Sequence, residues 1–303
     1  MFLKKKGHNV FIGTSRKEML SQALDGFNVV LTDWKNKKSL KNICLDIDII
    51  IHATGMNAKD CQLDPARAMK VNGLYTEKLI SAAVTMNVKK FIYLSTAHVY
   101  CSPLVGKINE DDFPKNPHPY ATSHLAGENA VFNKVNEKKI EGYVLRIANA
   151  FGAPISKQTN CWSLVIQDFC KQIVEKEKIL INSNFNIQRN FIPINAVCEI
   201  INNIIKIKKS SYKIRPINVG SEMSNTIKEM ADLISNRYKL MTGSDISIET
   251  TKIKGNSKKI LYLEYSSENL KKLKININTN FEREIDKLLA FCKKNFKRKL
   301  NLL

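Results

Sequence analysis

The chain has 303 residues, of which 44% are hydrophobic, and it carries a formal net charge of +20 at pH 7. This length and apolar content are typical of one large folded domain or of two smaller ones, and they exclude an intrinsically disordered chain. The sequence shows no run of 18 apolar residues and no apolar leader with a small-residue cleavage site. We therefore expect no membrane span, no secretory signal and a cytoplasmic location.

The cysteines and the basic residues are both scattered along the chain. Seven cysteines without paired spacing favour reduced thiols, and they predict neither a disulfide framework nor a metal site. Because the lysines form no general cluster, we expect no nucleic-acid binding despite the positive charge. The one dense basic run, at 293–299, ends a predicted helix. We interpret it as a solvated helix end, with an anionic membrane surface or an acidic partner as the alternative.

The first predicted elements surround the stretch GHNVFIG at 7–13. Gly7 and Gly13 match the outer glycines of a dinucleotide loop, but Val10 takes the middle position, where its Cβ would meet the pyrophosphate. If this stretch closed such a loop, too few residues would separate Asp33 from the apolar run at 47–54. We therefore expect a second strand at 8–13 and a third at 27–32. The first strand and its glycine loop would then precede Met1.

Apolar runs alternate with helical patterns through the first two-thirds of the chain. The runs are nearly continuous in apolar character, as parallel strands buried on both faces should be. This pattern predicts a Rossmann-like, doubly wound α/β sheet that lacks its first strand. The expected strands are 8–13, 27–32, 47–54, 89–96 and 141–149, and the expected helices between them are 65–87 and 119–136.

After residue 152 the alternation loosens. Helical patterns and short strands follow, and no linker separates them from the first part of the chain. We expect an NAD(P)-binding domain at 1–151, to which 190–215 return, and a smaller substrate-binding α/β region at 152–189 and 216–303. The later elements are predicted as helices at 161–178, 225–241 and 281–298 and strands at 179–181 and 216–219.

Six stretches in a fixed order resemble the extended short-chain dehydrogenase/reductases, a family that includes nucleotide-sugar epimerases and dehydratases. The resemblance covers most of the chain, and it implies a nicotinamide cofactor and a nucleotide-sugar substrate. The stretches are IIIHATG (49–55), VNGLYTEKLISAAVTMNVKKFIYLSTAHVY (71–100), PYATSHLAGE (119–128), LRIANAFG (145–152), QRNFIPINAV (188–197) and INVGSEMSNTIKEMADLI (217–234).

The resemblance assigns catalytic roles to Tyr120, Thr96 and His124. Tyr120 would be the acid/base, and Thr96 would hydrogen-bond the reacting oxygen. Positions 120 and 124 share a helix face, and the family has a lysine at the second position whose charge lowers the pKa of the tyrosine. His124 replaces it here, either as a partly working substitute or as a surface residue of a degenerate site. Tyr120 could also be an ordinary helix residue, and Thr96 could simply end a strand.

The cofactor residues implied by the resemblance lie at three places. Ala53, Thr54 and Gly55 follow the strand that passes beside the cofactor, and Asn72 lies on the following helix. Ser15 and Arg16 end the second predicted strand without an acidic residue, which favours NADP over NAD, although Arg16 could be a solvated residue at a helix start. Asp33 is a candidate for the adenine edge or else a turn residue.

Two residues are candidates for substrate contact. Asn149 resembles the asparagine that meets the substrate, or it caps the turn before Gly152. Arg189 would bind the diphosphate with its guanidinium fork, or it is a surface cation at a strand start. Asn190 and Asn195 stand where the family has acidic residues, which weakens the match around Arg189.

Two functions follow as hypotheses. The first is an NAD(P)-dependent nucleotide-sugar epimerase, dehydratase or reductase in which Tyr120 moves a proton. The second is a truncated or degenerate relative without catalysis, a binding module or a remnant, which is favoured by the missing glycine loop, by His124 and by a content of only 12 glycines.

A homodimer is expected from the same resemblance, with the helices at 65–87 and 119–136 packed against their copies. Both helices carry apolar residues that we expect to extend beyond one core-facing stripe. They are Leu79, Ile80, Ala82, Ala83, Val84, Ala126, Ala130, Val131 and Phe132.

Overall fold

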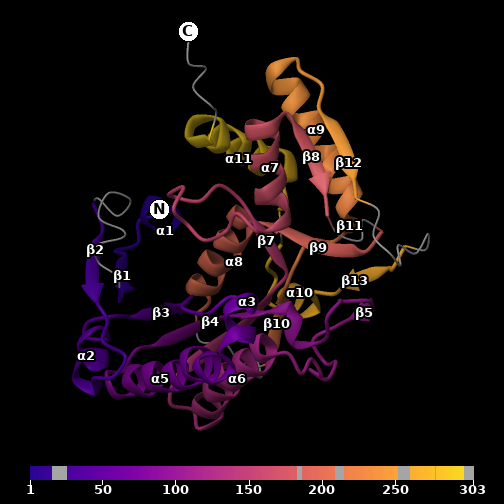
Figure 1. Cartoon of the computed structure of the whole chain (residues 1–303). Coiled ribbons are helices and arrows are strands. Elements are labelled where there is room, and N and C mark those ends of the chain that lie inside the picture. The colour runs from indigo at the N-terminus through magenta and orange to yellow at the C-terminus, as the bar shows by residue number, and fades with distance from the viewer. Residues whose placement is uncertain (16–25, 183–185, 209–214, 252–259, 277, 297–303) are drawn as a thin grey trace.

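The computed structural model describes residues 1–15, 26–182, 186–208, 215–251, 260–276 and 278–296 (Figure 1). Its helices are α1 (Phe2–Lys5), α2 (Lys37–Asn42), α3 (Ala58–Leu63), α4 (Pro65–Ala68), the π-type η1 (Met69–Leu74), α5 (Tyr75–Thr85), the 3-10 helix η2 (Ala97–Val99), α6 (Pro119–Asn136), α7 (Val165–Lys176), α8 (Ile194–Lys206), α9 (Ile227–Thr242), α10 (Glu268–Lys272) and α11 (Phe281–Phe296). Its strands are β1 (Phe11–Thr14), β2 (Asn28–Leu31), β3 (Ile49–His52), β4 (Lys90–Thr96), β5 (Gly106–Ile108), β6 (Glu141–Ile147), β7 (Asn149–Phe151), β8 (Lys178–Ile181), β9 (Gln188–Pro193), β10 (Pro216–Val219), β11 (Ser224–Thr226), β12 (Ser247–Thr250) and β13 (Leu263–Tyr265).

Four parallel strands form the central sheet in the order β10-β6-β4-β3. Helices α5 and α6 lie along one face of this sheet and α8 along the other (Figure 1). Side chains of β4 alternate between these faces: Phe91 and Tyr93 join the cluster with α5 and α6, whereas Ile92 joins the cluster with α8. Such strands need apolar residues on both sides, which explains their continuous apolar runs. The predicted doubly wound α/β fold is confirmed.

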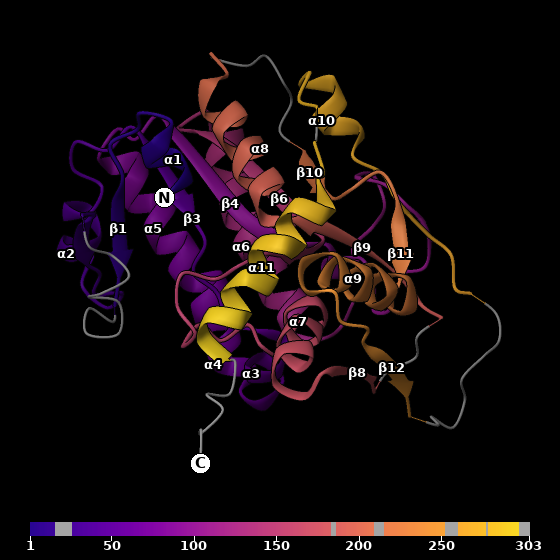
Figure 2. The same ribbon diagram turned by 90° about the horizontal axis from the view of Figure 1, so that it is seen from above.

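A second hydrophobic unit forms around three later helices, α7, α9 and α11, which pack together (Figure 2). Phe151 of the edge strand β7 and Phe191 of the middle strand β9, in the sheet β11-β9-β7, also belong to this cluster. Helix α9 begins with a capping box, in which Thr226 accepts from the backbone of Glu229 and the Glu229 side chain accepts from that of Thr226. The assignment of the two regions to cofactor and substrate stays a prediction.

The predicted strands and helices of the first two-thirds all occur, with one difference. The segment predicted as one helix at 65–87 is divided into α4, η1 and α5, because the backbone changes to π-type winding at Met69–Leu74. Helices α2, α3, α8 and α10 and the short strands β5, β7, β9, β11, β12 and β13 were not predicted as elements.

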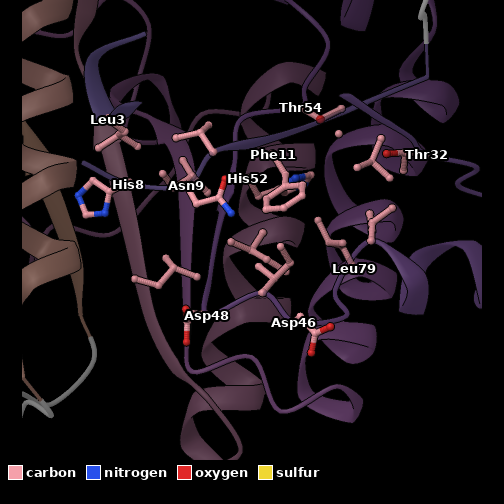
Figure 3. Close-up of a pocket in the computed structure, with 18 of the residues that line it drawn as sticks. Leu3, His8, Asn9, Phe11, Thr32, Asp46, Asp48, His52, Thr54 and Leu79 are labelled. Atoms are coloured by element: carbon pink, nitrogen blue, oxygen red, sulfur yellow. The ribbon is translucent and has the colours of Figure 1, made fainter. Parts of the chain in front are cut away.

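The parallel sheet is divided between β1 and β3. Strands β1 and β2 pair only with each other within the described part of the chain, and a cavity of about 390 Å³ lies between this pair and β3 (Figure 3). The stretch 7–13 therefore leads into β1 and does not form a phosphate loop. The short helix α1 precedes it. The strand that we expected before Met1 would belong to the place where the sheet is divided.

The apolar residues expected at a dimer interface are partly covered within the subunit. Leu79, Ile80, Ala82, Ala83 and Val131 are buried, because α5 and α6 pack against each other and the sheet. The other four, Val84, Ala126, Ala130 and Phe132, are half-buried. The homodimer stays a prediction.

No helix among the described residues is long and apolar enough to cross a membrane. Of the basic run at 293–299, Lys293 and Lys294 lie in the last turn of α11, and residues 297–299 lie outside the described part.

A buried ion pair fixes α6 on the sheet. Arg146 of β6 donates to both carboxylate oxygens of Glu128 on α6, at 2.7–3.2 Å, and Ser95 of β4 donates to the same carboxylate at 2.5 Å. The side chains of Arg146 and Glu128 are 5% and 1% exposed. Burial alone would lower the pKa of Arg146, but the hydrogen bonds and the charge of Glu128 outweigh it and leave the pKa raised. Removal of either charge would therefore leave the other buried without a partner.

On the opposite face, Lys90 connects the start of β4 to the end of α8. Its ammonium donates to the carbonyl oxygens of Ile204 at 2.8 Å and Ile207 at 2.9 Å. The Ile204 carbonyl also accepts from the backbone of Ile207 at 3.2 Å, and a cation at this end of α8 complements the helix dipole.

We predict that Arg146→Met will lower the free energy of unfolding by about 3–5 kcal/mol, because it leaves the Glu128 carboxylate buried without its partner. Urea denaturation followed by circular dichroism measures this. The double variant Arg146→Met with Glu128→Met should recover most of the loss. A double variant as unstable as the single one would contradict the charge explanation.

We also predict that Gly127→Ala will destabilise the chain by about 1–3 kcal/mol through overpacking. A Cβ at Gly127 would lie 2.6 Å from the backbone oxygen of Asn72, so α6 and η1 would have to separate. Gly55→Ala is the matched control, since its Cβ would come no closer than 3.4 Å to any neighbouring atom. Equal melting temperatures for the two variants would rule out this tight contact.

Candidate active site

The first turn of α6 meets the carboxyl end of β4. Pro119 begins the helix, and His118 caps it by accepting from the backbone of Tyr120 at 3.1 Å. This places Tyr120, half-buried, beside Thr96, whose side chain acts to lower the pKa of the phenol. The structure therefore brings together the two residues that the sequence places 24 positions apart.

The surroundings of Tyr120 favour its protonated form. Burial raises the pKa of the phenol, and the hydrogen bond from Thr96 offsets only part of this effect. A phenol of this kind is ready to donate a proton, whereas its use as a base requires a cation or a high pH.

His124 lies one helical turn after Tyr120, and the two rings meet edge to face at 4.6 Å. It is only 6% exposed, so the interpretation as a surface residue is wrong. Its Nδ1 is 3.0 Å from the hydroxyl oxygen of Tyr93, and burial lowers its pKa to about 4. The imidazole is therefore neutral at pH 7 and does not supply the charge of a lysine.

A buried polar chain continues from His124 into the protein. Tyr93 is hydrogen-bonded to Thr76, which in turn donates to the backbone oxygen of Asn72 at 2.6 Å and lies 3.0 Å from Nε2 of His52. The pKa of His52 is lowered to about 4, by burial first and by the charge of His124 second. The sequence analysis missed this chain, although a histidine and a tyrosine within apolar strand runs were a signal.

The loop after β3 lies beside His124. Ala53, Thr54 and Gly55 are exposed. A side chain at Gly55 would begin 3.6–3.7 Å from Cε1 and Nε2 of the His124 ring, so glycine keeps this approach open to a flat group. The free nitrogen of His124, Nε2, therefore lies on the side where the cofactor is expected.

Asn72 has a different position from the one expected. It is fully buried, with its amide oxygen accepting from the backbone of Met56 at 2.8 Å and its amide nitrogen donating to Ser123 at 3.0 Å. The side chain thus holds the 53–56 loop against α6, and it can act on a cofactor through that loop.

The other proposed cofactor residues lie at the ends of β1 and β2. Ser15 is exposed directly after β1, and Arg16 lies outside the described residues. Asp33 is exposed after β2, and its carboxylate accepts from the backbone of Lys35 at 2.9 Å, which is the turn role that we had left open.

The substrate side contains Asn149, Arg189 and a residue that the sequence analysis missed, His98. Asn149 donates to the backbone oxygen of Asn190 at 2.8 Å and is hydrogen-bonded to His98. The pKa of His98 is lowered by burial and by the nearby charge of Arg189. His98 lies in η2, two residues after Thr96, and so stands between the reacting end of β4 and Arg189 on β9.

Arg189 is a half-buried cation. Burial lowers its pKa, and it belongs to no ion pair among the residues that the structure describes. A buried guanidinium without a carboxylate partner suits an anionic ligand. Asn190 beside it is fully buried and bonds the backbone of Ser221, so this asparagine has a structural task.

Groups suited to a metal ion are not gathered anywhere in the described part: it contains no cluster of three or more His, Cys, Asp or Glu side chains that could hold one.

Comparison with known proteins shows which family the chain belongs to. Residues 1–220 match the family model described as NAD dependent epimerase/dehydratase family. The chain is 31% identical over 194 residues to human dTDP-D-glucose 4,6-dehydratase, a match that covers 62% of this chain and 53% of that protein. The chain thus spans about half the length of the curated relatives that it matches.

Solved structures of related fold cover nearly the whole chain. UDP-glucuronic acid 4-epimerase from Bacillus cereus in complex with NAD matches 98% of this chain and 94% of its own, with a TM-score of 0.78 and 19% identity. RMD from Pseudomonas aeruginosa complexed with NADPH matches 94% and 98%, with a TM-score of 0.72 and 18% identity. These likenesses show the fold, and the family model, which matches most of the chain, shows that this protein belongs to the NAD-dependent epimerase/dehydratase family.

Proposed function

We propose that the protein is an NAD(P)-dependent nucleotide-sugar epimerase, dehydratase or reductase in which Tyr120 is the acid/base. The observation that carries this proposal is that Tyr120, in the first turn of α6, lies close enough to Thr96, at the carboxyl end of β4, for the Thr96 side chain to lower the pKa of its phenol in part. Ligands of open α/β sheets bind at this end of the strands. The curated relatives named for dTDP sugars support a nucleotide-sugar substrate.

The chemistry at Tyr120 is a proton transfer with a sugar hydroxyl. The Tyr120 phenolate takes the hydroxyl proton as the sugar carbon is oxidised, and the phenol returns it on reduction, while the Thr96 hydroxyl would turn to hydrogen-bond the same sugar oxygen. A nicotinamide, when bound, supplies the hydride acceptor or donor. Thr96 thereby holds the sugar oxygen within reach of Tyr120.

The residues beside Tyr120 fit a nicotinamide nucleoside. Gly55 leaves room for a flat group next to the His124 ring, and Nε2 of His124 is free to hydrogen-bond a ribose hydroxyl. His124 would then keep the binding role of the family's lysine without its charge. Ser15, Arg16 and Asp33 remain the proposed contacts of the adenosine half, and NADP remains the favoured cofactor on the sequence of 14–16.

Arg189 is the proposed contact of the substrate diphosphate. Its half-buried guanidinium lacks an ion-pair partner in the described part, and it lies close enough to His98 to depress the pKa of that imidazole. Asn149 and His98 would then lie between the diphosphate and the sugar carbon whose hydroxyl exchanges its proton with Tyr120. Localisation in the cytoplasm and a homodimer complete the proposal.

Two observations favour the second candidate, a non-catalytic relative. The pKa of Tyr120 is raised rather than lowered, and His124 is neutral. Such a site could bind a nucleotide sugar without turning it over. Activity measurements separate the two functions.

We predict that the purified chain, incubated with NAD⁺ or NADP⁺ and a panel of dTDP- and UDP-hexoses, will convert one of them. Tyr120→Phe should lower kcat by about 10²–10⁴-fold, because it removes the acid/base. Thr96→Val should cost roughly 10–100-fold, since a hydrogen bond to a developing charge is lost. Mass spectrometry detects loss of water, and proton NMR of the sugar detects epimerisation.

The control for this experiment is Tyr238→Phe on α9, which removes a phenol outside the site and should leave turnover unchanged. If no hexose is converted while calorimetry shows that one binds and that Arg189→Gln abolishes this binding, the non-catalytic candidate is correct.

We predict that kcat/KM will rise with pH between about pH 7 and pH 9.5, because the phenol must lose its proton to act as a base and its pKa lies above the ordinary value of about 10. His124→Lys should shift this profile toward lower pH by about 1–3 units, since a cation next to the ring stabilises the phenolate. His8→Lys adds the same charge outside the site and should not shift it. A profile that is the same with His124 and with lysine would exclude Tyr120 as the titrating base.

A further inference from the structure

Polar residues on the substrate side hold the backbone of His98 in place. Its N–H donates to the Thr96 hydroxyl at 3.2 Å, and its carbonyl accepts from the side-chain amide of Asn116 at 2.7 Å. The same Asn116 is buried, and its amide oxygen accepts from the backbone of His118 at 3.0 Å. His98 is therefore tied both to the carboxyl end of β4 and to the loop that leads into α6.

The side chain of His98 is influenced by Asn149 of β7. The amide nitrogen of Asn149 donates to the backbone oxygen of Asn190 at 2.8 Å, which directs this nitrogen toward β9. Asn149 acts to raise the pKa of His98, the effect expected when an amide oxygen faces a ring N–H. One ring nitrogen would then carry the proton, and the other would keep its lone pair. The half-buried ring thus has one nitrogen that can accept a proton.

The charges that act on His98 all oppose its protonation. Burial lowers its pKa most, the charge of Arg189 on β9 follows, and the charge of His118 makes the smallest contribution. Arg189 belongs to no ion pair among the residues that the structure describes, so no carboxylate there compensates its charge. In the empty site His98 is therefore a weak base. The cation that weakens it most is the residue assigned above to the substrate diphosphate.

We propose that the substrate diphosphate, once bound at Arg189, converts His98 into a second base of the site. This inference rests on the proposed function, which places the diphosphate at Arg189. The phosphate charges compensate the guanidinium, so the field that disfavours an imidazolium at His98 is removed. His98 thus gains basicity when the nucleotide sugar is in place.

The proton that His98 accepts is one bonded to carbon. When the hydroxyl beside Tyr120 has become a carbonyl and its hydride has passed to an oxidised nicotinamide, the C–H bond on the neighbouring sugar carbon is acidified. His98 takes this proton, and the electron pair of the broken bond passes into an enolate whose oxygen Thr96 would hydrogen-bond. The imidazolium returns a proton to the sugar. This step serves loss of water or inversion at the neighbouring carbon, neither of which Tyr120 performs alone.

Histidine NMR tests the switch without turnover. The chain has five histidines, so labelling of ring Cε1 with carbon-13 gives a spectrum of few signals, and His98→Gln identifies the signal of His98. The probe is dTDP-glucose without added cofactor, because its phosphates stay ionised throughout the titration. At saturation it should raise the titration midpoint of His98 by about 1 pH unit, since it compensates the charge of Arg189.

Variants of three basic residues show which charge is responsible. Arg189→Gln should raise the midpoint of His98 in the empty protein. The matched control Arg215→Gln removes an exposed cation elsewhere and should not. His118→Asn keeps an acceptor that caps α6, and it should leave the response to dTDP-glucose in place.

Three results would overturn the switch. The first is a midpoint that does not move at saturation, and the second is equal midpoints in the empty wild type and the empty Arg189→Gln variant. The third is a failure of both dTDP-glucose and UDP-glucose to bind in calorimetry, which would also remove the diphosphate role of Arg189.

The role of His98 as a base is measured on the hexose that the enzyme converts. In D2O, proton NMR should show that the hydrogen on the carbon next to the oxidised one is lost by exchange. His98→Gln should slow this exchange by about 10²-fold or more, while reduced nicotinamide, detected by its absorbance, still forms. Equal exchange with the wild type would rule out His98 as the base. If no hexose is converted, the proposed enzyme function fails, and the histidine titration alone decides whether the diphosphate acts on His98.

Discussion

The candidate site depends on the buried ion pair between Glu128 and Arg146. Helix α6 carries both Tyr120 and His124, and this pair, with the Ser95 hydroxyl, ties that helix to β4 and β6 at a fixed depth. Two charges inside a protein are costly to desolvate, and their attraction compensates for this only when the geometry is close and the remaining lone pairs are bonded. The pair therefore adds little net stability but makes any other position of α6 costly. The Tyr120–Thr96 contact, which joins the same helix to the same strand, is held in register by it.

The polar groups behind Tyr120 follow a different rule. His124, Tyr93, Thr76 and His52 form a buried chain of neutral groups that satisfy one another, and burial keeps both imidazoles uncharged. A lysine at position 124 would need a charge in a place where its neighbours are a phenol and another imidazole. The neutral histidine thus fits the interior better than a cation does. In its place, no positive charge at position 124 stabilises the phenolate of Tyr120. This balance between stability and catalysis is common where function and burial meet.

Much of the fold could be predicted because local signals agree with it. Pro119 and the apolar spacing that follows mark α6 at its observed bounds, and continuous apolar runs mark β3, β4 and β6. Three-residue strands such as β7 and β11 are too short for a periodic signal. Five of the nine residues expected at a dimer interface are buried because α5 and α6 cover each other as well as the sheet, which the pattern of one helix cannot show. The pairing of Tyr120 with Thr96 came from the family resemblance, whereas His98 and the neutral state of His124 depend on burial, which only the three-dimensional structure gives.

The division of the sheet has a consequence for local unfolding of the protein. A pair of four-residue parallel strands is only marginally stable by itself, so β1 and β2 depend on their packing against the rest of the protein for their order. The cavity removes part of that packing on the side where a neighbouring strand would otherwise lie. This pair is thus the unit most easily released from the native state, whereas β4 and β6, covered on both faces, would open only with the whole protein. The amino-terminal edge can therefore unfold and refold locally while the Tyr120 site remains intact.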